Sequence, residues 1–200
     1  GICGAIEGTF TLDGEEQLRR RPVADMAAPL AALGARVRYA EREGYPPVVV
    51  QGRPWRGGCV TVPGSVSSQF LSGLLMGAPL ARGPVTLESQ VLDSRGIVSA
   101  PYVHMTTAVM ARFGAVVEQL EAFVWRMAPG PYTAADFSVE PDTSAAAFLW
   151  AAGVITGGEV LVEGTGGDCL QGDAIFPNLL ARMGCQVERR PGGISVAGHP

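Results

Sequence analysis

Polar side chains that suit the binding of an anion gather in the segment Gly64–Gln69. Its sequence, Gly-Ser-Val-Ser-Ser-Gln, places three hydroxyls and an amide just ahead of an apolar stretch that is typical of a helix. Free backbone N–H groups and the positive end of the helix dipole attract phosphate, and hydroxyl donors add to that attraction. N-capping by Ser67 or Ser68 is the alternative, but it needs one serine and leaves the second serine and Gln69 unexplained.

Two further segments precede expected helices. Arg19-Arg20-Arg21-Pro22 is the one dense positive cluster of the sequence, and arginine suits bidentate contact with a carboxylate or a phosphate. Ser99-Ala100-Pro101-Tyr102 places a hydroxyl and a phenol at another helix start. The alternatives are a solvated charge run for the arginines, and capping by Ser99 with packing of Tyr102 for the second segment.

Other polar segments are explained without chemistry. Asp142 or Thr143, within Glu140–Ser144, suffices as an N-cap, and Gln171-Gly172-Asp173 opens the last expected helix in the same way. His104 lies inside an expected helix, where we predict a structural role. No Ser-His-Asp arrangement, phosphate-binding loop or dinucleotide fingerprint occurs in a usable context.

The cysteines predict neither disulfides nor metal binding. Cys3, Cys59, Cys169 and Cys185 are far apart in the sequence, and the chain has only two histidines. No zinc-ligand spacing can be assembled from them, so we expect no metal and no other cofactor. The interpretation is of reduced thiols in a cytoplasmic protein, most of them packed as small apolar side chains.

Composition excludes several classes of protein. Of the 200 residues, 47% are hydrophobic and 17% charged, which excludes disorder of the whole chain. Apolar runs are too short to span a membrane, and no secretory signal is visible. The net charge of −4 argues against a nucleic-acid partner.

Internal repetition indicates the fold. Helix-like stretches end alike at Leu33-Gly34, Phe113-Gly114 and Met183-Gly184, and they open about 12 residues earlier, at Pro22, Pro101 and Gln171. A β-branched run precedes each, at 9–12, 85–87 and 160–162, and a hairpin-like pair of runs follows each, at 37–39 with 48–50, 116–118 with 123–125, and 187–189 with 194–196. Further helices are expected at about 68–80 and 143–155. The unit is therefore strand–helix–strand–helix–strand–strand.

These units predict an α/β (α+β) fold of two-layer repeats, with apolar helix faces packed beneath a mixed sheet. Residues 1–128 would form a partial domain, with an incomplete first repeat at 1–52 and a full repeat at 58–127. Residues 132–200 would form a further complete repeat, either the first of a second domain or a third repeat of one compact domain. Because residues 1–8 supply only the tail of a helix, we expect the chain to be an incomplete portion of a larger protein.

The sequence resembles the EPSP synthase (3-phosphoshikimate 1-carboxyvinyltransferase) family. The resemblance rests on GSVSSQFLSGLLMGAPLA at 64–81 and continues through RRRP at 19–22, GYPPVVVQG at 44–52, VSAPYVHMT at 98–106, SVEPDTSAAAFLWAAGVITGG at 138–158 and LQGDAIFPNLLARMG at 170–184. SVSSQFL is the most specific segment. The resemblance implies the inside-out α/β barrel of enolpyruvyl transferases, each of whose two domains holds three such repeats.

The resemblance implies a transferase of the shikimate pathway to aromatic amino acids. The 5-hydroxyl of shikimate 3-phosphate adds to C2 of phosphoenolpyruvate, C3 is protonated, and phosphate leaves, without a cofactor. By carry-over, Ser67, Ser68, Gln69, Ser99 and Tyr102 would bind shikimate 3-phosphate. Arg21 would contact phosphoenolpyruvate.

The sequence also departs from the family. Ala100 and His104 stand where the family usually has Lys and Asp, and the family's acid/base residues lie outside this chain. We therefore expect activity to need a complementary segment or chain. The alternatives are a non-catalytic module that keeps the fold and binds at most a phosphorylated ligand, and a relationship to the UDP-N-acetylglucosamine enolpyruvyl transferases.

Overall fold

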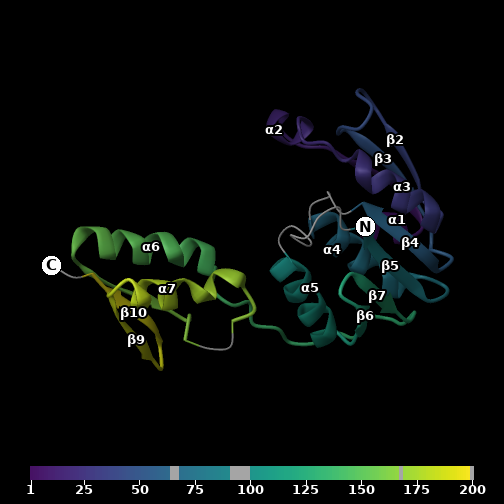
Figure 1. Ribbon diagram of the computed structural model, residues 1–200. Coiled ribbons are helices and arrows are strands. Elements are labelled where there is room, and N and C mark those ends of the chain that lie inside the picture. Colours follow the sequence, from purple (N-terminus) through teal and green to yellow (C-terminus); the bar gives the residue numbers. More distant parts are fainter. Residues whose placement is uncertain (64–67, 91–99, 167–168, 199–200) are drawn as a thin grey trace. The chain divides into compact units, whose positions relative to one another are not determined.

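The computed structural model describes residues 1–63, 68–90, 100–166 and 169–198 (Figure 1). The chain divides into two compact units, Gly1–Ala135 and Asp136–Pro200. Among the described residues, no helix combines the length and the apolar character that crossing a membrane requires.

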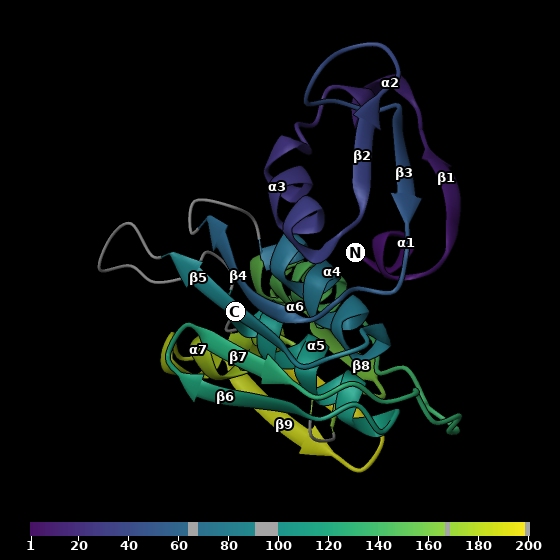
Figure 2. The same cartoon turned by 90° about the vertical axis from the view of Figure 1, so that its right-hand side faces the viewer.

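The second repeat has the expected order of elements. They are β4 (Gly58–Pro63), α4 (Ser68–Gly77), the 3-10 turn η1 (Ala78–Leu80), β5 (Val85–Gln90), α5 (Ala100–Arg112), β6 (Val117–Glu121) and β7 (Val124–Met127). The sheet runs β4-β5-β7-β6. Only its β4–β5 pair is parallel, so the sheet is mixed, as predicted. Figure 2 shows the four strands with α4 and α5 behind them.

The first repeat has a smaller sheet. Its elements are α1 (Ile2–Ala5), β1 (Gly8–Leu12), α2 (Glu16–Arg19), α3 (Ala24–Leu33), β2 (Arg36–Tyr39) and β3 (Val48–Gly52). The strands run β1-β3-β2, all antiparallel, and the expected hairpin register is confirmed by the pairing of Val37 with Val50. Helix α3 begins at Ala24 rather than at Pro22, because the Val23 N–H donates to the carbonyl of Gly44 (2.8 Å) and holds Val23 outside the helix.

One apolar core joins the two repeats. Leu33 of the first repeat, Trp55 of the connection, and Leu74, Leu75 and Leu87 of the second are completely or almost completely shielded from solvent. Burial of side chains of this size stabilises a fold by roughly 1.5–3 kcal/mol each. The helices of each repeat therefore pack partly against the other repeat.

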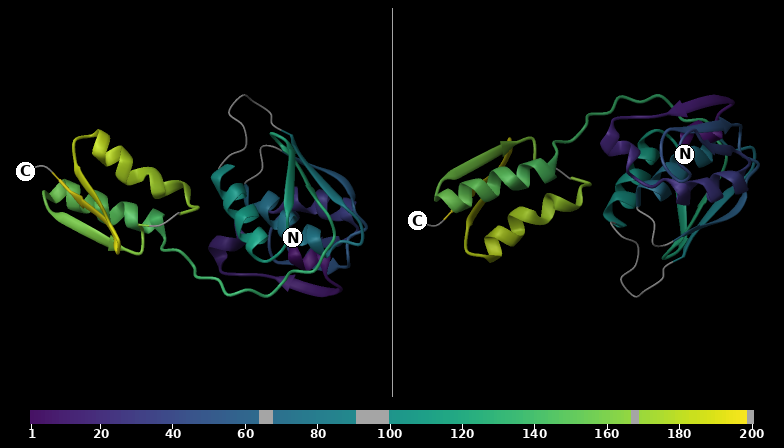
Figure 3. Two further views of the ribbon diagram at one scale, coloured as in Figure 1. Left: turned by 90° about the horizontal axis from the view of Figure 1, so that it is seen from below. Right: turned by 90° about the horizontal axis from the view of Figure 1, so that it is seen from above.

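The unit Asp136–Pro200 contains a single repeat. Its elements are α6 (Thr143–Thr156), β8 (Glu159–Glu163), the 3-10 turn η2 (Gly172–Ile175), α7 (Phe176–Arg182), β9 (Gln186–Arg190) and β10 (Gly193–Ala197). The sheet runs β8-β10-β9, all antiparallel. Helices α6 and α7 lie side by side (Figures 1 and 3). The local core is small and centres on Trp150, Leu180 and Ile194.

The expectation of a complete third repeat was wrong. Residues 131–142 form no strand, so β8 lies at an edge of its sheet among the described residues. Within this stretch Val139 is 84% exposed and Phe137 is 39% exposed, so neither side chain is held in a sheet face. Pro131 and Pro141 flank the stretch, and proline cannot donate to a strand ladder.

The glycine helix ends are confirmed in all three repeats. Gly34, Gly114 and Gly184 have φ values of +106°, +81° and +98°, in the left-handed region. Their N–H groups donate to carbonyls of the last helical turn. Glycine adopts this conformation without the steric cost of a Cβ, so each helix turns into the following strand at a fixed place.

Candidate functional site

The parallel strands β4 and β5 determine where α4 and α5 begin. The two strands are paired in register to their ends, Pro63 opposite Gln90. Each is followed along the chain by a helix, α4 after β4 and α5 after β5. Because neighbouring parallel strands end at the same edge of a sheet, both helix N-termini lie on that side, where ligands of α/β proteins commonly bind (Figure 2).

Three of the candidate binding residues lie in the described part of these helices. Ser68 is the first residue of α4 and is buried, whereas Gln69 next to it is exposed. Tyr102 lies in the first turn of α5 and is 52% exposed. Ser67 and Ser99 lie outside the described residues.

A side-chain contact ties the two helices together close to these N-termini. The Thr106 hydroxyl donates to the Ser72 hydroxyl at 2.8 Å, one turn after Ser68 on α4 and one turn after Tyr102 on α5. The Thr106 hydroxyl also lies 2.8 Å from the carbonyl oxygen of Tyr102. These contacts hold the first turns of α4 and α5 in a fixed relation, which favours a preorganised site.

The three consecutive arginines have different surroundings. Arg19 donates from Nε to Asp13 (2.8 Å) and from a terminal nitrogen to Glu41 (3.2 Å). The guanidinium of Arg19 lowers the pKa of the Asp13 carboxyl by this hydrogen bond. Arg20 pairs with Glu16 one turn earlier.

Arg21 is exposed, and within the described residues no acidic side chain pairs with it. Its guanidinium is thus available for an anion, whereas those of Arg19 and Arg20 are already engaged. Asp13 and Glu41 were missed by sequence reasoning. No local pattern relates Glu41 to Arg19, since the two are 22 positions apart.

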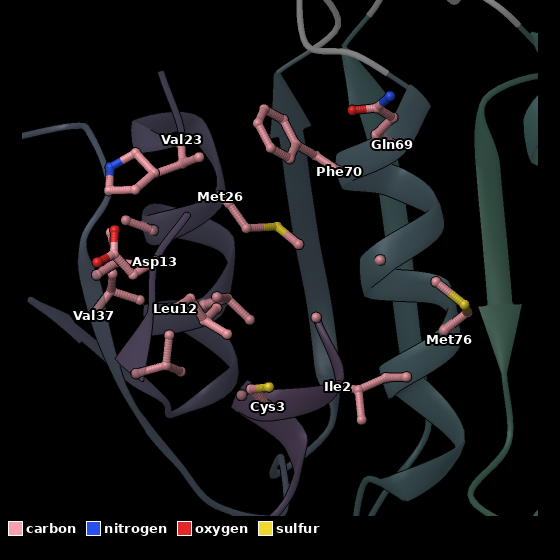
Figure 4. A pocket seen from close by; sticks show the side chains of 18 of the residues that line it. Ile2, Cys3, Leu12, Asp13, Val23, Met26, Val37, Gln69, Phe70 and Met76 are labelled. Carbon is pink, nitrogen blue, oxygen red and sulfur yellow. The ribbon is translucent and has the colours of Figure 1, made fainter. Parts of the chain in front are cut away.

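One cavity is lined by residues of both α3 and α4. Val23, two residues after Arg21, and Gln69 line a cavity of about 470 Å³ in the unit Gly1–Ala135. Figure 4 shows both residues at the same end of it. Val23 and Gln69 thus line the same cavity, although they are far apart in the sequence.

The start of α6 is held by a structural network. The Asp142 carboxylate accepts from the N–H of Ala145 (3.0 Å), so Asp142 is the N-cap that the sequence left open between it and Thr143. The Gln171 amide donates to Glu140 (3.1 Å) and to the Pro141 carbonyl (2.7 Å), and its oxygen accepts from the Thr143 N–H (2.9 Å). Capping and cross-linking account for these residues.

Among the described residues, the cysteines and His104 form no metal site. All four cysteines are free thiols, and Cys59 is exposed while the other three are half-buried. Burial raises the pKa of the Cys169 thiol. His104 is exposed on α5. No cluster of three potential metal ligands occurs within the parts of the chain that the structure describes.

Solved structures resemble this fold. EPSP synthase from Acinetobacter baumannii superposes with a TM-score of 0.70 at 24% identity, over 98% of this chain and 44% of that one. The enolpyruvyl transferase NikO from Streptomyces tendae gives a TM-score of 0.63 at 20% identity, over 96% and 44%. The chain thus has the fold of the enolpyruvyl transferases.

Sequence comparison defines the family. The family model described as EPSP synthase (3-phosphoshikimate 1-carboxyvinyltransferase) matches residues 1–200. Proteins named 3-phosphoshikimate 1-carboxyvinyltransferase are 39% identical in Methanosphaerula palustris, over 98% of this chain, and 40% identical in Shewanella amazonensis, over 94%. The chain belongs to the EPSP synthase family, as the resemblance predicted. It spans only 45% and 44% of those relatives' lengths.

Proposed function

We propose that this chain is the shikimate 3-phosphate-binding portion of an EPSP synthase. The observation that carries the proposal is the parallel β4–β5 pair, which brings the N-termini of α4 and α5 to one sheet edge. Ser67, Ser68 and Gln69 at the first helix and Ser99 and Tyr102 at the second would bind the substrate. Helix N-termini and hydroxyl donors favour a phosphorylated ligand.

Arg21 would contact phosphoenolpyruvate. Its exposure and the engagement of Arg19 and Arg20 by acidic side chains support this assignment. A free guanidinium fits the planar, bidentate geometry of a carboxylate or a phosphate. Because Arg20 is adjacent in the sequence and is already paired with Glu16, it is a suitable control for Arg21.

In the proposed reaction, the 5-hydroxyl of shikimate 3-phosphate attacks C2 of phosphoenolpyruvate as C3 gains a proton. The tetrahedral adduct then loses phosphate and a proton from C3, which restores the alkene. The residues of this chain would hold and orient two anions, a contribution of proximity and charge stabilisation. The acid/base groups would come from a complementary segment or chain. We place the reaction in the cytoplasm, which the four free thiols support.

Calorimetric titration with shikimate 3-phosphate tests the proposal. We expect binding that Ser68→Ala weakens by about tenfold, since a hydrogen bond to a charged group contributes roughly 1.5–3 kcal/mol. Ser138→Ala, the same change at an exposed residue of the other unit, is the matched control and should bind normally. A folded chain that gives no heat of binding would contradict the proposal.

Titration with phosphoenolpyruvate distinguishes the enzyme from the non-catalytic module. We expect phosphoenolpyruvate to bind the complex of the chain with shikimate 3-phosphate. Arg21→Ala should weaken that binding, and Arg20→Ala should leave it unchanged. Binding of shikimate 3-phosphate without any response to phosphoenolpyruvate would favour the non-catalytic module that binds only a phosphorylated ligand.

A further inference from the structure

Arg21 lies in a short connection between two helices of the first repeat. Helix α2 ends at Arg19 and α3 begins at Ala24, so only residues 20–23 join them. Pro22 follows Arg21, and the residue ahead of a proline is largely restricted to extended backbone conformations. The proline ring then fixes the next φ angle at about −65°. This short and restricted connection determines where the Arg21 side chain leaves the backbone.

The loop that joins β2 to β3, residues 40–47, supports this connection on its C-terminal side, and we call it the β2–β3 loop. The N–H of Val23 donates to the Gly44 carbonyl at 2.8 Å. Gly44 is buried, and its φ of +84° lies in the left-handed region, which residues other than glycine and asparagine rarely adopt. A methyl group on Gly44 would lie 3.5 Å from the Cβ of Ala24, so the first residue of α3 packs close to this part of the loop. The Gly44 conformation thus fixes the backbone two residues after Arg21.

The same loop supports the connection on its N-terminal side through a side chain. Helix α2 lies next to the loop in Figure 2, and Glu41 accepts from a terminal nitrogen of Arg19 at 3.2 Å. The Nε of Arg19 donates to Asp13 at 2.8 Å, so two carboxylates orient one guanidinium. The Arg19–Glu41 pair is exposed and of the kind that stabilises a fold only slightly. Its consequence is local, because it holds the residue two positions ahead of Arg21 against the loop.

The β2–β3 loop is held in shape by contacts of its own. The N–H of Ala40 donates to the Pro47 carbonyl at 2.9 Å and closes the base of the loop. Within the loop, the N–H of Tyr45 donates to the Arg42 carbonyl at 3.1 Å, and the Arg42 guanidinium lies 3.8 Å from the centroid of the Tyr45 ring. That distance is typical of a cation–π contact. The loop therefore has a defined conformation, which makes it a suitable support for the neighbouring connection.

We propose that the β2–β3 loop positions Arg21 for the anion that it binds. Gly44 and Glu41 are the positioning residues, and each acts through a residue two positions from Arg21 rather than by touching the ligand. The Arg21 side chain is long and exposed, so an anion must immobilise it. A backbone that is already fixed lowers the entropy lost in that step. The proposal rests on the assignment of Arg21 under the proposed function and names what holds this residue in place.

The test compares Gly44→Val with Gly44→Asn. Valine is strained at a positive φ and should displace the Gly44 carbonyl, whereas asparagine tolerates this conformation and should preserve it. In the titration of the shikimate 3-phosphate complex with phosphoenolpyruvate, we expect Gly44→Val to raise the Kd about three- to tenfold, the factor that corresponds to ordering one long side chain. Gly44→Asn should restore most of the affinity. Both variants should bind shikimate 3-phosphate normally, because its proposed contacts lie at α4 and α5.

Glu41→Gln tests the second support. It keeps the size of the side chain and removes the charge that faces Arg19, so we expect a smaller rise in the Kd for phosphoenolpyruvate, of about twofold. Glu43→Gln, the same change at an exposed residue of the same loop, is the matched control and should have no effect. Glu41→Gln also serves as the second variant if Gly44→Val does not fold.

Backbone order in the connection gives a readout that does not depend on the ligand. We expect NMR order parameters of about 0.85 for the amides of Arg21 and Val23 in the unsubstituted chain, and values below about 0.6 in Gly44→Val. Mobile amides in the unsubstituted chain would overturn the proposal. So would loop variants that leave phosphoenolpyruvate binding unchanged, or that weaken shikimate 3-phosphate binding equally.

The two readouts separate failure of this proposal from failure of the proposed function. If the unsubstituted chain binds shikimate 3-phosphate but not phosphoenolpyruvate, the ligand assigned to Arg21 is wrong, and the order parameters alone decide whether the loop holds this residue. If phosphoenolpyruvate binds Gly44→Val and the unsubstituted chain equally well, the assignment of the ligand stands and the positioning role is refuted.

Discussion

Helices α4 and α6 occupy the same place in two repeats, but their surroundings differ. Gly83 and Gly158 align the repeats at an offset of 75 residues. Leu75 and its counterpart Trp150 are both fully buried. At the preceding position, Leu74 is fully buried, whereas its counterpart Leu149 is 54% exposed.

The difference lies in the helices that cover the outer face. In the unit Gly1–Ala135, α4 packs against α5 of its own repeat and against α1 of the first repeat. In the unit Asp136–Pro200, α6 is apolar all round, and Phe148 and Ile155 are 79% and 83% exposed. The comparison teaches that one sheet buries one face of such a helix, and that a second repeat is needed to bury the other.

Trp150→Ala should have the largest effect. The indole is fully buried and donates to the Ile194 carbonyl at 3.1 Å, at the centre of a small core. Truncation costs about 3–5 kcal/mol, which is comparable to the whole stability of a unit this small. We expect hydrogen–deuterium exchange in residues 136–198 to rise to the rate of an unfolded chain while that of the first unit is unchanged.

Trp150→Phe is the control, since it keeps most of the ring and loses the donor. It should leave residues 136–198 protected. Equal exchange in Trp150→Ala and the unsubstituted chain would show that the small core is not what holds this unit.

Leu74→Ala and Leu149→Ala test the comparison directly. We expect Leu74→Ala to lower the free energy of unfolding of its unit by about 2–5 kcal/mol, because it leaves a cavity in a packed core. Leu149→Ala should change the other unit by less than about 0.5 kcal/mol, since the side chain is largely in water. Regional hydrogen exchange or urea unfolding measures both. Similar losses at the two positions would mean that the outer face of α6 is covered in solution.

Gly77→Ala and Ala152→Gly are opposite substitutions at corresponding positions, and we expect each to have a smaller effect on stability. A methyl group on Gly77 would lie 2.6 Å from the Trp55 ring, so we expect a loss of about 1–3 kcal/mol by overpacking. The counterpart Ala152 is exposed, and Ala152→Gly should cost roughly 0.5–1 kcal/mol through helix propensity alone. Thermal unfolding measures both. Stabilisation by Gly77→Ala would show that Trp55 can move aside.

Local signals predicted most of the elements. The apolar run at Ser68–Leu80 and the glycines at 34, 114 and 184 defined helices and their ends, because helix periodicity and left-handed glycine caps are short-range features. The prediction of a complete third repeat, with a strand ahead of α6, was wrong because strand formation depends on long-range contacts. A strand forms only where a neighbouring strand pairs with it, and that pairing cannot be read from the local sequence of residues 131–142.

The candidate site was only partly accessible from sequence. The helix starts at Ser68 and Ala100 are preceded or accompanied by polar clusters in the sequence, but the placement of both starts at one sheet edge follows from the parallel pairing of β4 and β5. The engagement of Arg19 by Asp13 and Glu41 is likewise a tertiary contact. The six binding residues remain a prediction that rests on family resemblance and on this geometry.

The pairing of the arginines has an electrostatic consequence. Asp13, Glu41 and Glu16 lie against Arg19 and Arg20, so the run with the highest density of positive charge in the sequence is close to neutral when seen from beyond a Debye length of about 8 Å. Long-range steering of an anion toward this segment is therefore weak. Arg21 therefore recognises an anion only at contact distance, and the association rate of an anionic ligand with this segment should depend little on ionic strength.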